Sequence, residues 1–126
     1  MPDLVLADTS IWVTHFRKSE NHLIQLLESG FVACHPFIIG ELACGSLKNR
    51  NEIIQLLEAL PNVPVLDHQE VMSFIESRKI MSKGIGYVDI HLLGSSLISD
   101  IPLWTLDKSL AKVASTLKIE YIKSKR

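Results

Sequence analysis

The sequence predicts an α/β fold of three layers, in which a central, mostly parallel sheet is flanked by helices. Short aliphatic runs alternate with longer segments of helical periodicity along the 126 residues, and strands that are separated by helices pair in parallel. We expect one domain, 1–126, because this length suits a single hydrophobic core. With 47% hydrophobic and 21% charged residues, the composition is ordinary for a globular protein, so the fold needs no disulfide.

The first half of the chain is predicted to begin with a buried strand over the aliphatic run 4–7. Gly30 marks the end of the second helix that follows. Pro36 suits the first position of a helix, since its missing N–H would have no helical partner there, and Pro61 stops the next helix. In order, the predicted elements are the strand 4–7, the helices 11–17 and 22–27, the strand 31–35, and the helices 36–45 and 51–60.

The second half is predicted to continue the alternation. Asp67 can cap a long helix, and the segment Gly84–Gly86 forms a hinge before a very apolar helix. In order, the predicted elements are the strand 63–66, the helices 67–83 and 88–98, the strand 103–105, the helix 108–117 and the strand 120–122.

Four carboxylates, Asp8, Glu41, Asp89 and Asp107, stand where a strand ends or near the beginning of a helix. Asp8 and Asp107 leave the carboxyl ends of two predicted strands, and Glu41 lies about one and a half turns into the helix after a third. Asp89 opens the helix that leads into the strand 103–105. The functional crevice of a parallel sheet lies beyond the carboxyl ends of its strands. We therefore expect the four side chains to meet at that edge.

Each acid also has a purely structural interpretation. Asp8 and Asp107 can simply cap the helices that follow them, and Glu41 and Asp89 can face solvent. The conjunction favours a site, because Glu41 and Asp89 are embedded in apolar sequence. Carboxylates rarely gather in semi-buried places unless a cation holds them.

An all-oxygen ligand set without paired His or Cys suits Mg²⁺ or Mn²⁺ rather than zinc. A water bound to such a metal can attack a phosphodiester, which is the logic of metal-dependent nucleases. The hydroxyls of Thr9, Ser10 and Thr105 can donate hydrogen bonds to the carboxylates and so orient them, or they can bond only to nearby backbone. The candidate metal ligands are Asp8, Glu41, Asp89 and Asp107.

The net charge of −1 argues neither for nor against a polyanionic partner. If the four acids hold cations, the rest of the surface is mildly basic. Arg78, Lys79 and Lys83 lie just before the helix of Asp89 and are candidate contacts for the phosphates of a nucleic acid. The alternative is that these cations are solvated side chains of a helix face.

Other enzyme classes lack their motifs here. The chain has no GxxxxGK(S/T) loop, no complete GxGxxG fingerprint and no GxSxG sequence. Ser10 stands where haloacid-dehalogenase-like phosphatases need a second Asp, and the adjacent acidic pair of a receiver domain is missing. No long apolar stretch or signal peptide is visible. We expect a cytoplasmic protein without membrane contact, whose cysteines, Cys34 and Cys44, are reduced and mostly buried.

Four ordered motifs resemble those of the PIN-domain ribonucleases. They are VLADTS at 5–10, IGEL at 39–42, GYVD at 86–89 and LWTLD at 103–107. Two longer stretches, HPFIIGELACG at 35–45 and DIHLL at 89–93, followed by LWT at 103–105, resemble one branch of these enzymes, the VapC-type toxins of bacterial toxin–antitoxin pairs. The resemblance spans essentially the whole chain, and four motifs in order are far more specific than one.

The resemblance implies a PIN-like fold and a Mg²⁺- or Mn²⁺-dependent endoribonuclease. Such a toxin cuts structured cellular RNA to stop translation, forms a homodimer, and is held inactive by a cognate VapB-like antitoxin. The family's acids match Asp8 and Asp89 as metal ligands, Glu41 as a ligand or a water-orienting group, and Asp107 as a ligand of a second ion. His91 matches the toxin branch, and we expect it to pack or to hydrogen-bond, since it lies on another helix face than Asp89.

Two alternatives stay open. The chain can be a non-catalytic RNA- or protein-binding module on the same fold, although the usual mark of such modules, the loss of one or more acids, is not seen. Trp12 and Phe16, one helical turn apart, can pack in the core or face an antitoxin or a second subunit.

Overall fold

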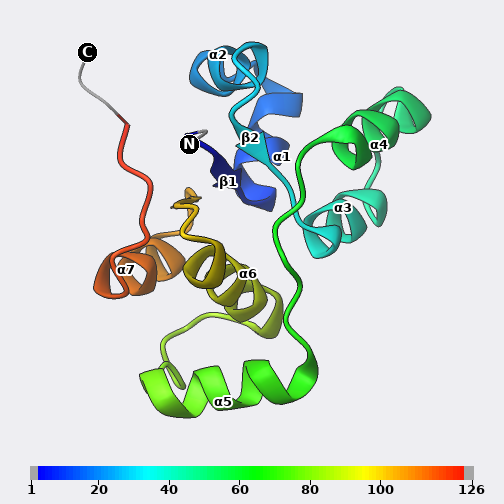
Figure 1. The fold of residues 1–126 in the computed structure, drawn as a ribbon. Helices are drawn as coiled ribbons and strands as arrows, with labels where there is room; N and C mark the ends of the chain where they lie inside the picture. The colour runs from blue at the N-terminus through cyan, green and yellow to red at the C-terminus, as the bar shows by residue number, and fades with distance from the viewer. Residues whose placement is uncertain (1–2, 124–126) are drawn as a thin grey trace.

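A three-stranded parallel sheet lies at the centre of the computed structural model, which describes residues 3–123 (Figure 1). In sheet order the strands are β2 (Val32–Ala33), β1 (Val5–Ala7) and β3 (Leu103–Trp104). Leu6 of the central strand pairs with Ala33 on one side and with Leu103 on the other. Every strand residue is buried, and the three carboxyl ends leave the sheet at the same edge.

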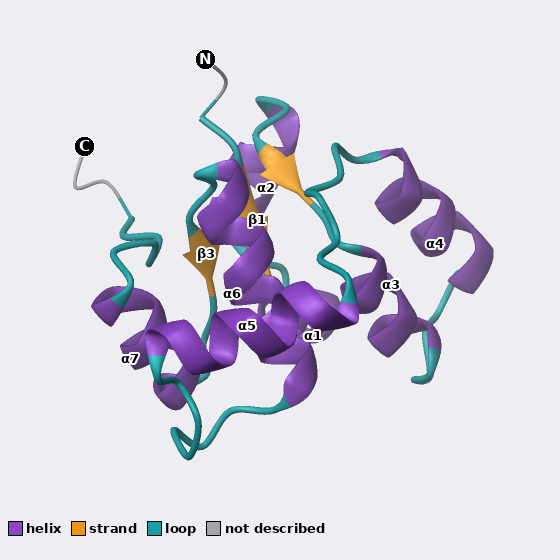
Figure 2. Ribbon diagram, turned by 60° about the horizontal axis from the view of Figure 1, so that its bottom comes forward, coloured by secondary structure: helices purple, strands orange, loops and turns teal. Residues whose placement is uncertain are grey.

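Seven helices surround the sheet in the described part of the chain, which confirms the predicted α/β class (Figure 2). α1 packs against β1 and α3, α3 packs against α4, and α5 crosses one end of α6 (Figure 1). The helices are α1 (Thr9–Arg17), α2 (Asn21–Glu28), α3 (Pro36–Ala43), α4 (Arg50–Ala59), α5 (His68–Arg78), α6 (Tyr87–Ser99) and α7 (Lys108–Thr116). None of the helices between residues 3 and 123 is long and apolar enough to span a membrane.

The predicted strand 63–66 is wrong. Only one parallel bridge forms in this region, between Asn62 and Cys34, and the chain beyond it is irregular. Pro61 and Pro64 explain the difference, because neither has an N–H to donate to a ladder. Val63 and Leu66 are buried, Val65 is 48% exposed, and the run does not extend the sheet.

The strand predicted over 120–122 is likewise reduced to a single bridge, between Glu120 and Leu103. Ile122 is 76% exposed, so little apolar burial holds this segment against the sheet. The strand predicted over 31–35 is shorter than expected, since His35 leaves the sheet to cap the next helix.

The helix predicted over 67–83 ends at Arg78. Lys79 adopts a left-handed conformation with φ of 54°, and the N–H of Ile80 bonds to the carbonyl of Ile75. This is the bond pattern of a Schellman stop, and it buries Ile80. The residues from 80 to 86 therefore form a loop rather than the last turn of a helix.

Capping groups fix the starts of several helices. Asp67 accepts a hydrogen bond from the Glu70 N–H at 2.8 Å, and Glu70 accepts one from the Asp67 N–H at 2.8 Å, so the predicted cap is a full capping box. Pro36 is the first residue of α3, as predicted. Its cap is His35, whose Nδ1 accepts from the Phe37 N–H at 2.9 Å.

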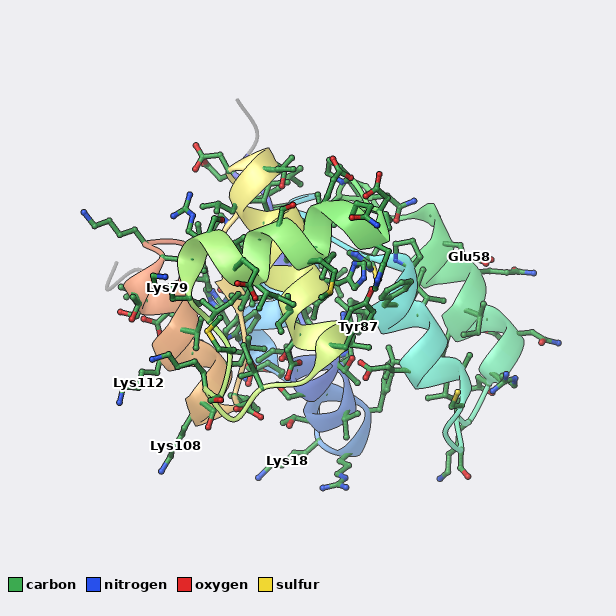
Figure 3. All side chains as sticks on the ribbon, turned by 90° about the horizontal axis from the view of Figure 1, so that it is seen from below. Lys18, Glu58, Lys79, Tyr87, Lys108 and Lys112 are labelled. Carbon is green, nitrogen blue, oxygen red and sulfur yellow. The ribbon has the colours of Figure 1, made fainter. Side chains whose placement is uncertain are left out.

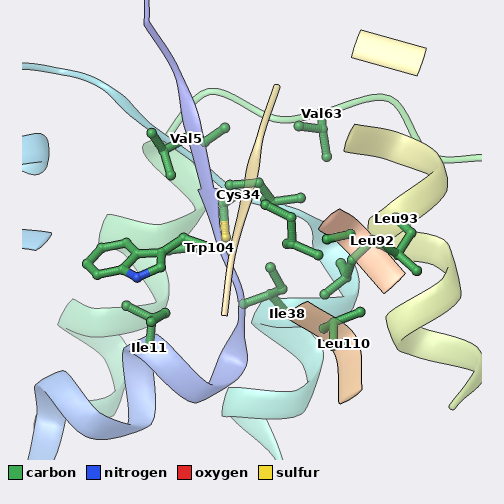
Figure 4. Close-up of a cluster of buried hydrophobic side chains, with 14 of the residues drawn as sticks. Val5, Ile11, Cys34, Ile38, Val63, Leu92, Leu93, Trp104 and Leu110 are labelled. Atoms are coloured by element: carbon green, nitrogen blue, oxygen red, sulfur yellow. The ribbon is translucent and has the colours of Figure 1, made fainter. Parts of the chain in front are cut away.

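The core lies between the sheet and the helices, and α6 runs through its middle. Seven consecutive residues of this helix, Ile90 to Ser96, are buried. Gly94 makes room for Leu66, because a Cβ at position 94 would lie 2.3 Å from Leu66 Cδ1 and would force that side chain to shift. Figure 4 labels nine members of the core: Val5, Ile11, Cys34, Ile38, Val63, Leu92, Leu93, Trp104 and Leu110.

The structure decides between the two alternatives for Trp12 and corrects the expectation for one of the two cysteines. Trp12 is fully buried, so its indole belongs to the core and to no interface, while Phe16 is half-buried and packs on it with ring centroids 5.9 Å apart. Cys34 is buried, and burial raises the pKa of its thiol to about 11. Cys44 is exposed, because it ends α3 on the side away from the core.

Candidate active site

Asp8 is the most enclosed acid of the candidate site, with 4% of its surface exposed. It follows β1 and caps α1. Its Oδ1 accepts from Ser10 Oγ at 2.5 Å and from the Ile11 N–H at 3.3 Å. Its Oδ2 accepts from Thr105 Oγ1 at 2.5 Å. Since Thr105 follows β3, this bond joins the carboxyl ends of two neighbouring strands.

Burial raises the pKa of Asp8 above the ordinary value of a carboxyl. The hydroxyls of Ser10 and Thr105 and the backbone N–H of Ile11 donate to the carboxylate and lower the pKa, but they do not offset burial. The ionised carboxylate is therefore well oriented, but its hydrogen bonds do not fully offset the cost of burying its charge. A nearby cation would offset the remainder.

Glu41 lies on α3 and accepts a hydrogen bond from Thr9 Oγ1 at 2.5 Å. Its side chain is exposed, so the expectation of a semi-buried carboxylate is wrong here. Ile38 and Leu42 occupy the buried face of this helix, and Glu41 points to the other side. The carboxylate thus stands at the open rim of the site.

Asp89 and Asp107 lie in the first turn of α6 and at the cap of α7. Asp89 Oδ2 accepts from the Gly86 N–H at 3.3 Å, and Asp107 Oδ1 accepts from the Leu110 N–H at 3.0 Å. The pKa of Asp89 is raised, first by burial and then by the negative charges of Asp107 and Glu41. The charge of Asp89 is therefore influenced by two acids on elements that are distant in sequence, Asp107 and Glu41.

The predicted supporting hydroxyls bond both to carboxylates and to backbone. Thr105 Oγ1 donates to Asp8 and accepts from the Asp107 N–H at 3.0 Å. Ser10 Oγ donates to Asp8 and accepts from the Leu106 N–H at 3.0 Å. Through these bonds the loop after β3 is fixed against the end of β1, which sets where Asp107 stands relative to Asp8.

The donor set fits a hydrated divalent cation. Among the residues from 3 to 123, no three His, Cys, Asp or Glu side chains are close enough to hold one ion together. A closed cage of protein ligands is not needed, since Mg²⁺ keeps several waters and is usually bound by one or two carboxylates. Burial raises the pKa of Asp89 most, and repulsion by Asp107 and Glu41 adds to it; a divalent cation would neutralise this repulsion.

Residues 5–115 match the family model of the PIN domain. The chain belongs to the PIN-domain family. It is also 42% identical, over 108 residues, to the proteins named ribonuclease VapC32 from Mycobacterium tuberculosis strains CDC 1551 and H37Rv, with 85% of this chain and 87% of each relative covered. Within the PIN domains it therefore belongs to the VapC family, as its motifs predicted.

The fold of this PIN domain is similar to the crystal structure of PAE2754 from Pyrobaculum aerophilum. The TM-score is 0.62, and the alignment covers 91% of this chain and 95% of that chain. At 14% identity the similarity shows a common fold. It agrees with the predicted PIN-like arrangement of a parallel sheet and flanking helices.

The candidate RNA contacts of this PIN domain, Arg78, Lys79 and Lys83, are exposed at the end of α5 and in the following loop. They line a groove together with Lys112 of α7. Lys112 was not among the predicted RNA contacts, because it reaches the groove only through the packing of α7 against the loop. Its spacing of four residues from Lys108 on one predicted helix face was the available signal.

His91 lies on α6, the helix of Asp89, and packs against α3, the helix of Glu41. Its ring centroid lies 4.6 Å from that of Phe37 and 4.7 Å from that of Tyr87, so it is a packing residue, one of the two roles expected for it. Within the described residues its Nδ1 has no hydrogen-bond partner. Phe37 of α3 thus contacts α6 through His91, a role that its sequence position did not indicate.

Proposed function

We propose that this VapC-family protein is a metal-dependent endoribonuclease that hydrolyses phosphodiester bonds in structured cellular RNA, as the toxin of a VapBC-type pair. The observation that carries the proposal is the enclosed carboxylate of Asp8 at the end of β1, both of whose oxygens accept hydrogen bonds from the hydroxyls of Ser10 and Thr105. The pKa of Asp89, which is raised first by burial and then by the charges of Asp107 and Glu41, agrees with it. The ribonuclease name of the 42% identical relatives supports it. We further propose that 1–126 acts as one nuclease domain.

Mg²⁺ or Mn²⁺ is the proposed cofactor, held by Asp8 and Asp89, with Glu41 as a further ligand or a water-orienting group and Asp107 toward a second ion. When bound, the cation supplies a water of lowered pKa and neutralises phosphate charge. Thr105 fixes one oxygen of Asp8, so this carboxylate needs little reorganisation.

The test is cleavage of total cellular RNA by the purified protein in Mn²⁺, followed by addition of a chelator. Wild type should cut RNA in Mn²⁺ and should stop cutting when the chelator is added. The cleavage rates of Asp8→Asn and Asp89→Asn should fall to background, because the amide keeps the shape of the carboxylate and loses its charge. Asp67→Asn is the matched control, since it removes a helix-capping carboxylate that is not among the four site acids. Undiminished cleavage by either site variant would refute the assignment.

A non-catalytic module would leave RNA intact in every one of these reactions. The four acids give no specific support to that alternative. RNA binding without cleavage by the wild type in Mn²⁺ would establish it.

The proposed partner is a VapB-like antitoxin that covers a groove between α1, α3 and α4. The groove has a volume of about 600 Å³ and is lined by Val13 and Phe16 on one side and by Leu47 and Ile53 on the other. Glu41 also lines it, so an occupant would sit beside the site. These apolar side chains suit a partner helix or strand.

Val13→Glu should weaken antitoxin binding at least tenfold, because a buried charge opposes apolar contact. Ile98→Glu, at a 60% exposed position on α6, should leave the affinity unchanged. Calorimetric titration of each variant with the antitoxin measures the two affinities. Equal affinities for the two variants would move the antitoxin to another surface.

We also propose that the chain forms a homodimer, which light scattering of the wild type checks.

A further inference from the structure

A basic groove lies between the end of α5, the loop after it, and α7. Its volume is about 450 Å³, and its lining includes the four cations Arg78, Lys79, Lys83 and Lys112. All four side chains are exposed. Figure 3 shows Lys79 and Lys112 on the same side of the molecule, away from Glu58 of α4. Residues from two distant parts of the chain thus build one positive surface.

None of these cations forms an ion pair with an acid of the described residues. Across residues 3–123, the one ion pair within 4.0 Å joins Lys123 to Glu20, which is outside the groove. None of the groove's ten described lining residues is acidic. Four like charges without counter-charges repel one another, so the groove presents an uncompensated field that attracts an anion.

The remaining polar lining suits phosphate rather than bases. The hydroxyls of Ser82 and Ser109 lie among the cations, and no described lining residue is aromatic. Hydroxyl and cationic side chains are the usual contacts to the sugar–phosphate backbone, whereas bases stack on aromatic rings. From Ser109 to Thr116 the helix advances about 10 Å, which is longer than a single phosphate and fits a stretch of polymer.

The groove begins where the acids stand. A Cβ placed on Gly84 would lie 3.4 Å from Ser109 Oγ, so the loop lies against the first turn of α7, two residues after Asp107. Two residues beyond Gly84, the Gly86 N–H bonds to Asp89. Both walls of the groove are therefore continuous with segments that carry candidate metal ligands.

We propose that this groove is a binding site for the phosphodiester backbone of a single-stranded stretch within the structured RNA substrate, and that it holds the strand on the α7 side of the bond to be cut. Binding here is independent of sequence and adds affinity without taking part in the chemistry. This inference rests on the proposed ribonuclease function and names the element that docks its substrate.

The test measures binding in a chelator, so that it does not depend on cleavage. A fluorescein-labelled oligouridylate is titrated with protein by fluorescence anisotropy over a series of KCl concentrations. Lys83→Gln/Lys112→Gln should weaken binding at least tenfold at low salt. It should also reduce the slope of log affinity against log salt by about 1.4, since each lost contact to a single strand removes about 0.7.

A matched pair of single variants separates the groove from net charge. Lys112→Gln should lower the salt slope by about 0.7, whereas Lys18→Gln, an exposed lysine at the end of α1 on another part of the surface (Figure 3), should leave it unchanged. Thermal unfolding of both variants should match the wild type. Equal slopes for the two variants, or no binding of the oligouridylate by the wild type, would overturn the proposal.

Cleavage in Mn²⁺ provides the second measurement. The double variant should raise KM for a long RNA and leave kcat unchanged, because the groove holds substrate and does not touch the reacting atoms. A lower kcat with unchanged KM would also overturn it. If the double variant bound RNA normally and lost affinity for an acidic protein segment instead, the groove would be a protein site.

Discussion

Asp8 is subject to opposing influences that are visible in its own contacts. Burial raises its pKa, while hydrogen bonds from Ser10 and Thr105 stabilise the ionised form. The same hydroxyls fix both carboxylate oxygens, so the group is oriented before any cation arrives. Because the ionised carboxylate is the form that binds metal, these two hydroxyls connect the local geometry to the pH range of activity.

Thr105→Val should move the acidic limb of the kcat/KM profile in Mn²⁺ toward higher pH. Loss of the Thr105 donor raises the pKa of Asp8 further, so the carboxylate becomes protonated sooner as pH falls. A hydrogen bond to a charged group is worth about 1.5 kcal/mol, which corresponds to a shift of about 1 pH unit. The profile of Thr14→Val, which removes a hydroxyl from α1 away from Asp8, should match the wild type. Coincident profiles for all three proteins would show that Asp8 does not control the acidic limb.

At the scale of the element, local chemistry decided which boundaries the sequence could predict. Asp67 and Pro36 mark helix starts through their own side chains, and both were predicted. The end of α5 carries no such residue, since Lys79 adopts its left-handed conformation as Ile80 turns into the core. The run 63–66 has strand-like side chains, but Pro61 and Pro64 have no backbone N–H to donate to a neighbouring strand. Those boundaries depend on packing and were missed.

Gly94→Ala should destabilise the protein by about 1–3 kcal/mol, the usual cost of overpacking a core. The new Cβ would lie 2.3 Å from Leu66 Cδ1, where α5 and α6 pack together. Gly40→Ala is the matched helical control, because nothing lies within 4 Å of a Cβ there. It should stabilise α3 by about 0.5–1 kcal/mol. Urea unfolding measures both, and equal stabilities would mean that Leu66 shifts without cost.

The cap of α3 should make stability depend on pH. Burial lowers the pKa of His35 to about 4, with a smaller contribution from His91. Because the unfolded chain takes up the proton first, stability is lost as pH falls below about 6.5, and the loss levels off near the folded pKa. This group alone accounts for about 3 kcal/mol over that range.

His35→Asn removes this titration and keeps an acceptor for the Phe37 N–H. The free energy of unfolding of this variant, measured by urea denaturation between pH 7 and pH 4, should fall less steeply than that of the wild type. A slope for His35→Asn as steep as the wild-type slope would contradict the assignment.

At the scale of the whole molecule, the parallel sheet brings the ends of β1 and β3 together, so that Asp8 bonds to Thr105, two residues before Asp107. The expected meeting of all four acids around one ion is not seen, since no three Asp, Glu, His or Cys side chains between residues 3 and 123 form such a group. What the sequence could not specify is their individual surroundings. Asp8 is buried and accepts a hydrogen bond from Thr105 of the neighbouring strand end. Glu41 is exposed because Ile38 and Leu42 occupy the buried face of α3. The basic groove likewise depends on how α7 docks against a loop, which no local pattern encodes.

The acids should couple metal binding to global stability. Asp107→Asn should raise the melting temperature in a chelator by about 2 °C, the shift expected for about 0.5 kcal/mol in a domain of this size, since it relieves repulsion with Asp89. The cap to Leu110 survives, because Asn also caps helices. Millimolar Mn²⁺ should stabilise the wild type by linkage and the variant less.

Differential scanning fluorimetry of both proteins, with chelator and with Mn²⁺, gives all four melting temperatures. Asp67→Asn controls for the loss of charge at a helix start and should be neutral or slightly destabilised in chelator. A wild type that is indifferent to Mn²⁺, together with an Asp107→Asn variant that melts earlier in chelator, would mean that Asp107 is only a cap.

The exposure of Cys44 gives this molecule a built-in attachment point for a reporter group. The chain has two cysteines, and Cys34 is buried with its thiol pKa raised to about 11, so alkylating dyes at neutral pH react with Cys44 selectively. That thiol lies three residues beyond Glu41, at the end of the same helix. A fluorophore there can report the arrival of metal, RNA or antitoxin at one rim of the site without replacing any of its carboxylates.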